Sequence, residues 1–145
     1  ALAADFRIAC AESRFSAKFS KLGFHQGFGT TITLPRVVGI QKAKWMLLTS
    51  ARLNGLQAFD IGLADYLVSK DNLMVKAKEL ADEINSCGPL GVQAIRFTVN
   101  EGIADEIAEI VKWELSEQDR LRGTSDFKEG SKASLERRNP NFTGS

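Results

Sequence analysis

The sequence predicts an α/β protein with a short strand-bearing front end followed by a helix-rich carboxyl-terminal region. Three observations support this prediction. Apolar side chains alternate over positions 6–10, which is the period of a β-strand. A glycine-rich loop over 23–29 opens onto a helical pattern. After residue 70, apolar residues recur at helical spacing in one segment after another.

The front end is predicted to hold short strands and little else that is regular. Residues 1–4 have the composition of a helix tail. A strand follows with Phe6, Ile8 and Cys10 on one side, and a second strand over 13–16 turns Phe15 inward. A third short strand is expected over 64–68.

Residues 15–39 organise the chain, because four of its twelve glycines and its single histidine fall there. Glycine accepts backbone angles closed to other residues, so 23–29 reads as a tight loop. Thr30 or Thr31 is then a candidate N-cap, and Gly39 ends the helix. Backbone N–H groups at such a helix start suit an anion or a polarised carbonyl. A plain loop-to-helix connection is the alternative interpretation.

The rest of the chain reads as a succession of helices without a linker or an internal repeat, so 1–145 is expected to form a single unit. Pro89 suits a first helical turn, and Gly102 suits a helix end. Helices are predicted over 40–50, 56–61, 71–85, 89–100, 103–121 and 126–136.

Composition excludes several classes of function. Hydrophobic residues make up 43% and charged residues 26%, which is typical of a globular protein with a core. A net charge of +1 argues against a nucleic-acid partner, and no apolar run is long enough for a membrane span. Cys10 and Cys87 are far apart and predict free thiols in a reducing cytoplasm. With one histidine and two isolated cysteines, no metal site is expected.

Five stretches of the chain form a recognisable series. They are A-D-F-R-I-A-C-A, then the glycine loop with L-P-R-V-V-G, then K-A-K-W-M-L-L-T-S, A-F-D-I-G-L-A-D-Y-L-V and L-E-R-R-N-P-N-F-T-G. Together these stretches resemble the enoyl-CoA hydratase/isomerase (crotonase) family. They run in the family's order and cover the chain. The positions that match the pattern of the first part are Asp5, Arg7, Ile8, Ala9, Phe15, Leu22, Gly23, Gly27, Gly29, Leu34, Pro35, Arg36, Val38 and Gly39.

The resemblance implies a partial crotonase-like fold, of the ClpP/crotonase class. A complete family chain is nearly twice as long, so this sequence resembles the carboxyl-terminal half only. Residues 1–70 would then form the last part of the α/β core, and 71–145 a helical oligomerisation region. A homo-oligomer (dimer, trimer or hexamer) is expected, because the missing half would leave the apolar side chains of residues 15–34 uncovered.

The family holds the oxygen of an acyl-CoA thioester in an oxyanion hole of backbone N–H groups, and its hydratases add two glutamates as base and acid. By resemblance, the first glutamate and both donors lie upstream of Ala1. The second glutamate position is occupied by Phe19, which transfers no proton. Phe19 therefore lines the pocket or packs in the core. His25 is then the catalytic candidate, or is an ordinary loop histidine.

The resemblance also implies the binding residues. Residues that would line the substrate pocket are Phe19, Leu22, Gly23, Phe24, Gln26, Gly27 and Gly29. Lys128, Lys132 and Arg137 are candidates for binding the CoA phosphates, with a solvated helix face as the alternative. The CoA thioester would be the substrate, and no separate cofactor is implied.

Two hypotheses follow. In the first, the chain is a truncated family member whose intact form acts on an acyl-CoA thioester, as a lyase or isomerase of fatty acid metabolism. In the second, the chain is a non-catalytic oligomerising remnant. Since the glutamate positions and the oxyanion half are absent, the sequence leaves open whether this chain is itself an enzyme.

Overall fold

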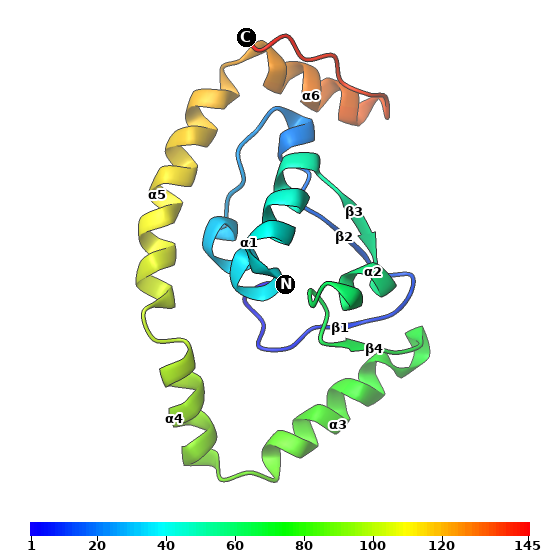
Figure 1. Cartoon of the computed structure of the whole chain (residues 1–145), viewed down its shortest axis with the longest axis vertical. Helices are drawn as coiled ribbons and strands as arrows, with labels where there is room; N and C mark the ends of the chain where they lie inside the picture. Colours follow the sequence, from blue (N-terminus) through cyan, green and yellow to red (C-terminus); the bar gives the residue numbers. More distant parts are fainter.

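The computed structural model describes all 145 residues and shows a small strand-bearing body, around which later helices form an arc (Figure 1). The strands are β1 Ile8–Ala9, β2 Arg14–Ser16, β3 Arg52–Asn54 and β4 Tyr66–Leu67. The helices are α1 Thr30–Thr49, α2 Gly55–Asp60, α3 Leu73–Asn85, α4 Pro89–Val99, α5 Ile103–Arg122 and α6 Ser125–Leu135. Two 3-10 turns, η1 Ser20–Leu22 and η2 Lys70–Asn72, precede the glycine loop and α3.

The strands pair into two separate two-stranded sheets. β1 runs parallel to β4, with Ile8 opposite Tyr66. β2 runs antiparallel to β3, with Phe15 opposite Leu53. The strands predicted over 6–10, 13–16 and 64–68 are confirmed in shortened form, whereas β3 was not predicted. Three residues with one apolar side chain show no period, so only the pairing with β2 identifies β3 as a strand.

One hydrophobic core lies between α1, α2 and the strands. Leu34, Val38, Ala43 and Met46 enter it from α1. The remaining core members are Ala9, Leu53, Ala58, Leu63 and Ala64. Phe15 is half-buried and packs against this cluster, as its inward orientation predicted.

Helix α1 is bent at Gly39, whose φ of 76° and ψ of 157° are not helical. Such angles are open to glycine and closed to most other residues. The prediction of one helix ending at Gly39 and another over 40–50 is therefore confirmed as two helical segments joined by a kink. The N-cap is Gly29, with φ of 69°, instead of the predicted Thr30 or Thr31.

Helix α2 begins with a reciprocal cap. The Asn54 side chain accepts from the Gln57 N–H at 2.9 Å, and the Gln57 side chain accepts from the Asn54 N–H at 3.0 Å. Gly55 is buried against the loop after β1, where a Cβ atom would collide with the Cys10 carbonyl. This close approach fixes α2 against the strand-bearing body.

The last helices run along the outside before the chain returns (Figure 1). Helix α4 has no buried residue, although it carries the exposed apolar side chains of Leu90, Ile95, Phe97 and Val99. Helix α5 comes back to the start of α1, and α6 packs on η1, where Gly130 allows close approach to the Leu22 backbone. No helix combines the length and the apolar character that crossing a membrane requires.

Two expectations about the front end are wrong. Residues 1–4 form a turn and not a helix tail. The apolar side chains of 15–34 do not form a bare patch, because Leu34 is buried and all the others except Phe28 are at least half-buried. Neighbouring segments of the same chain, α5 and α6 above all, supply that cover. The exposed apolar surface lies instead on α1, α2 and the helical arc.

Candidate functional site

The glycine loop over 23–29 connects η1 to α1, and α5 and α6 press against it. Gly23 and Gly29 adopt φ of 64° and 69°. A Cβ atom on Gly27 would lie 2.5 Å from Gln118 Nε2, and one on Gly29 would lie 2.8 Å from Ile107 Cγ2. The loop therefore has its glycines where helix α5 leaves no room for a side chain.

A buried carboxylate from α5 holds the loop and the start of α1 together. Glu114 is 1% exposed. Its Oε2 accepts from the Gly29 N–H at 2.8 Å, and its Oε1 accepts from the Thr31 N–H at 3.1 Å and the Thr31 hydroxyl at 2.6 Å. The anion predicted for this helix start is thus supplied by the chain itself.

Sequence reasoning missed Glu114, although a signal was present. In the sequence of α5, the apolar residues Ile107, Ile110 and Val111 recur at helical spacing. Glu114 lies seven, four and three residues after them, so it falls on the same helix face. A carboxylate at a buried helical position requires partners, and the N–H groups of a helix start are suitable ones.

His25 is half-buried in this loop, with its Nδ1 2.8 Å from the Gln26 carbonyl oxygen. Because a carbonyl only accepts, Nδ1 donates and Nε2 is left free to accept a proton. No carboxylate is hydrogen-bonded to the ring. The pKa of the Glu117 carboxyl is lowered, mainly by the hydrogen bond from Arg120 and to a smaller extent by the nearby His25.

The other predicted pocket residues do not line one common cavity. Phe19 is half-buried beside η1. The Phe24 ring packs on Phe127 of α6, with centroids 4.7 Å apart. Gln26 donates from Nε2 to the Thr31 hydroxyl at 3.1 Å. Neither of the two cavities described below is lined by these three residues or by the loop glycines, whereas Leu22 lines the basic one.

A basic groove of about 580 Å³ lies between η1, the end of α1 and the end of α6. Its cationic lining residues without an ion-pair partner are Lys18, Lys21, Arg52 and Arg137. The remaining lining residues are Leu22, Ser50, Ala133, Ser134, Arg138, Asn139 and Pro140. No carboxylate lines this groove, so it is a site of uncompensated positive charge.

The groove contains one of the three residues that the sequence proposed for CoA. Arg137 lines it, while Lys128 and Lys132 are exposed on α6 outside its lining. Arg138 also lines it, but its guanidinium is engaged by Glu129 and Glu136. That pairing, together with an N–H from Asn141, lowers the pKa of Glu129 to about 2. Glu129 thereby fixes the chain end that forms one wall of the groove.

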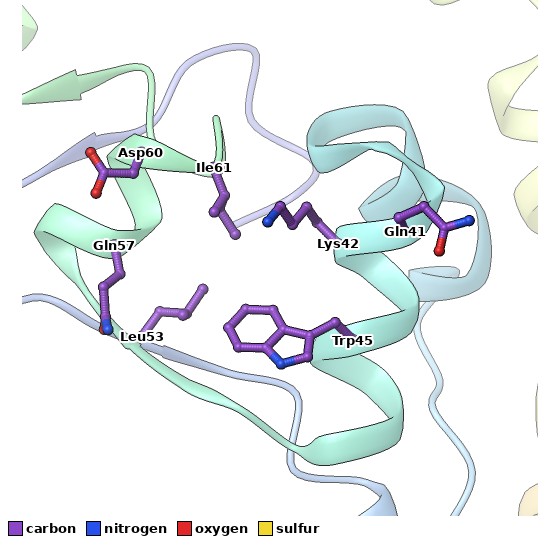
Figure 2. Close-up of a pocket in the computed structure, with 7 residues that line it drawn as sticks. All are labelled: Gln41, Lys42, Trp45, Leu53, Gln57, Asp60 and Ile61. Carbon is purple, nitrogen blue, oxygen red and sulfur yellow. The ribbon is translucent and has the colours of Figure 1, made fainter.

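A second cavity of about 380 Å³ lies between α1 and α2 (Figure 2). Figure 2 shows Trp45 and Lys42 projecting from α1 toward Leu53 and Ile61. Gln41, Gln57 and Asp60 complete its rim. No group of three or more His, Cys, Asp or Glu side chains is arranged to hold a metal ion.

The chain matches the family described as enoyl-CoA hydratase/isomerase over residues 1–145. It is 37% identical over 142 residues to a crotonyl-CoA hydratase of Syntrophomonas wolfei, which covers 98% of this chain and 55% of that relative. It is 33% identical over 145 residues to a 1,2-epoxyphenylacetyl-CoA isomerase of Escherichia coli, covering 99% of this chain and 55% of that protein. The chain thus spans about half the length of the curated relatives it matches.

Solved structures agree with this similarity. An enoyl-CoA hydratase from Mycobacterium avium subsp. paratuberculosis superposes with a TM-score of 0.88 at 26% identity, over 99% of this chain and 58% of that one. An enoyl-CoA hydratase/isomerase from Pseudoalteromonas atlantica gives 0.87 at 25% identity, over 98% and 57%. The predicted α/β, partial crotonase-like fold is confirmed.

Proposed function

Since the chain belongs to the enoyl-CoA hydratase/isomerase family, we propose that it forms part of a protein whose intact form acts on an acyl-CoA thioester through an oxyanion hole. The chain covers 55% of the crotonyl-CoA hydratase it resembles, which supports the reading of a truncated member. The observation that carries a role in CoA binding is the basic groove.

The groove suits the phosphates of CoA. A CoA thioester carries a pyrophosphate and a 3′-phosphate, and both are recognised by Lys and Arg side chains. Lys18, Lys21, Arg52 and Arg137 come from three separate segments and meet here with no carboxylate to neutralise them. The proposed CoA phosphate site therefore consists of Lys18, Lys21, Arg52 and Arg137, whereas Lys128 and Lys132 lie outside the groove.

His25 is the proton-transfer group in the glycine loop. Its Nδ1 donates to the Gln26 carbonyl, which leaves the Nε2 lone pair available as a proton acceptor. Phe19, which stands at the family's glutamate position, contributes only an apolar surface. In this proposal the oxyanion donors come from the part of the fold that this chain does not cover.

A binding measurement tests the CoA site. Titration with CoA, followed by calorimetry at low salt, should show saturable binding. Lys21→Glu or Arg137→Glu should weaken it at least about tenfold, because one charge-assisted contact contributes about 1.5–3 kcal/mol. Lys128→Glu and Lys132→Glu make the same charge change outside the groove and should alter affinity less than twofold. Equal losses in both sets would mean that CoA does not bind in the groove.

The second candidate function is a non-catalytic oligomerising remnant. It is favoured by α4, where Leu90, Ile95, Phe97 and Val99 are 67–79% exposed on a helix without a buried residue. Such a helix fits a homo-oligomer in which another copy covers it. Loss of crotonyl-CoA absorbance, measured with the intact form and compared with a full-length family hydratase, separates the candidates. Turnover within tenfold of that control, abolished by His25→Ala, would reject the remnant.

Two free cysteines, Cys10 and Cys87, fit a reducing compartment, and we place the protein in the cytoplasm on that ground.

A further inference from the structure

The tautomer of His25 depends on the carbonyl oxygen beside its ring. The ring Nδ1 lies 2.8 Å from the Gln26 carbonyl oxygen. With the proton on Nδ1 this contact is a hydrogen bond, whereas with the proton on Nε2 two lone pairs would face each other at the same distance. The groups that fix the Gln26 carbonyl therefore decide which ring nitrogen is left to accept a proton.

Helix α5 holds the backbone on both sides of Gln26 through the Gln118 side chain. This side chain donates from Nε2 to the His25 carbonyl oxygen at 3.2 Å. The same Nε2 atom lies against the buried Gly27, where it would be 2.5 Å from an added Cβ atom. One half-buried side chain thus contacts the residue before Gln26 and the residue after it.

A second path of hydrogen bonds reaches the Gln26 side chain from Glu114. The buried carboxylate accepts from the Thr31 hydroxyl at 2.6 Å, which commits the hydroxyl proton to Glu114. The hydroxyl oxygen is then left as an acceptor, and it accepts from Gln26 Nε2 at 3.1 Å. A carboxylate that only accepts therefore orients the hydroxyl and, through it, the Gln26 amide.

Glu114 and Gln118 are four residues apart on α5 and lie on one helix face. We propose that both are positioning residues for His25, because together they hold Gln26 so that Nδ1 carries the ring proton and Nε2 keeps its lone pair. Their hydrogen bonds go to the glycine loop and the start of α1, so each acts on the ring through Gln26. This inference rests on the proposed function, in which Nε2 is the proton acceptor.

The single histidine allows a direct test, because every imidazole signal of the chain comes from His25. The full chain is labelled with ¹⁵N, and a long-range ¹H–¹⁵N spectrum at a pH where the ring is neutral gives the ratio of the two tautomers. The Nδ1–H tautomer should exceed the Nε2–H tautomer at least about fivefold, since a hydrogen bond of ordinary strength gives a ratio of that order. An Nε2–H majority in the unmodified chain would overturn the proposal.

A matched pair of substitutions tests Gln118. Gln118→Met keeps the length of the side chain without its amide, and should lower the tautomer ratio at least about threefold. Gln93→Met is the same change at an exposed position of α4 and should leave the ratio within about twofold. Circular dichroism shows that each variant is folded. The same ratio in both folded variants would refute the role of Gln118.

A second pair tests the path from Glu114 and does not depend on the folding of Gln118→Met. Thr31→Val removes the hydroxyl between Glu114 and Gln26, and should lower the ratio at least about threefold. Thr31→Ser keeps the hydroxyl and should retain the ratio of the unmodified chain. A purely structural role would change the unfolding midpoint of Thr31→Val and leave the tautomer as it is. Equal ratios in the valine and serine variants would refute the path through Glu114.

The tautomer is measured without substrate, so this test is separate from the catalytic role of His25. If His25→Ala leaves the turnover of the intact form unchanged, the catalytic role fails, whatever the tautomer ratio. If His25→Ala abolishes turnover but the ring populates both tautomers equally, the positioning by α5 fails alone.

Discussion

Replacing Glu114 is the sharpest test of how the glycine loop is held. Its carboxylate accepts three hydrogen bonds at 2.6–3.1 Å from Gly29 and Thr31, and the side chain is 1% exposed. Glu114→Ala would leave two N–H groups without an acceptor and would remove the acceptor for the Thr31 hydroxyl proton. A helix start would also lose the negative charge that its dipole favours.

The magnitude follows from these contacts. A hydrogen bond to a charged group contributes about 1.5–3 kcal/mol net, and bonds that share one carboxylate are not additive. We therefore expect Glu114→Ala to lower the free energy of unfolding by about 3–5 kcal/mol. Glu114→Gln keeps the shape but turns one acceptor into a donor that faces an N–H, so about 2 kcal/mol is expected.

Urea unfolding, followed by far-UV circular dichroism, measures this difference. With a slope of about 2 kcal/mol per molar urea, Glu114→Gln should move the midpoint by about 1 M. Glu109→Gln on the same helix is the control. Its exposed pair with Lys112 should change the free energy of unfolding by no more than about 0.5 kcal/mol.

A second readout separates the contacts that Glu114 makes with Gly29 and Thr31 from the general stability of α5. Amide exchange at Gly29 and Thr31 should accelerate in Glu114→Gln and stay unchanged in Glu109→Gln. If the two glutamine variants unfold at the same urea concentration and these amides exchange at the same rate in both, the contacts of Glu114 do not stabilise the loop.

Three further predictions follow from the backbone and the ion pairs. Gly55→Ala should lower the urea midpoint by at least about 1 M, because its Cβ would strike the Cys10 carbonyl, whereas Gly91→Ala, open on α4, should leave it unchanged or raise it. Phe28→Gly should raise the free energy of unfolding by about 1 kcal/mol in the same assay, since Phe28 adopts φ of 62° and its ring is 91% exposed; a loss of stability would show that the ring packs. The folded-state pKa of Glu129 is lowered from 4.5 to about 2, so its contribution is full above pH 5 and is lost as pH falls toward 2. In Arg138→Gln, the free energy of unfolding should lose the part of its fall between pH 5 and pH 2 that Glu129 contributes. The same pH dependence with and without the substitution would contradict the assignment.

Long periodic segments made most of the fold predictable. The helices expected over 103–121 and 126–136 are observed at Ile103–Arg122 and Ser125–Leu135, because apolar spacing and the turn between them define both ends. Strand β3 was missed, since its identity depends on pairing with β2 and not on its own residues. Apolar pattern identifies helices locally, whereas very short strands exist only through their neighbours.

The candidate site was predictable only where its residues are close in sequence. The loop around His25 was located from its glycines, whereas the partners of Glu114 are 83 and 85 residues away. In the sequence alone, a charged residue within an apolar stripe indicates only a break in the pattern. Its role is recognised only once the fold shows that a distant helix start binds it. The basic groove is similar, because Lys21, Arg52 and Arg137 are brought together by the contact between η1 and α6.

Helix α1 explains why the two cavities can be tested separately. In its second half, after the kink at Gly39, Trp45 lines the cavity between α1 and α2. This half ends next to Ser50, which lines the basic groove. Ser50 is held by the Ser20 hydroxyl at 2.7 Å and accepts from the Lys21 N–H at 3.1 Å, so the groove wall is fixed to η1 by its own contacts. The cavity that Trp45 lines is fixed to the core by Ala43 and Met46. Because each cavity has its own anchors, Lys21→Glu should weaken CoA binding by the same factor whether or not Trp45→Ala is present. A different factor in the double variant would mean that the two ends of this helical segment move as one body.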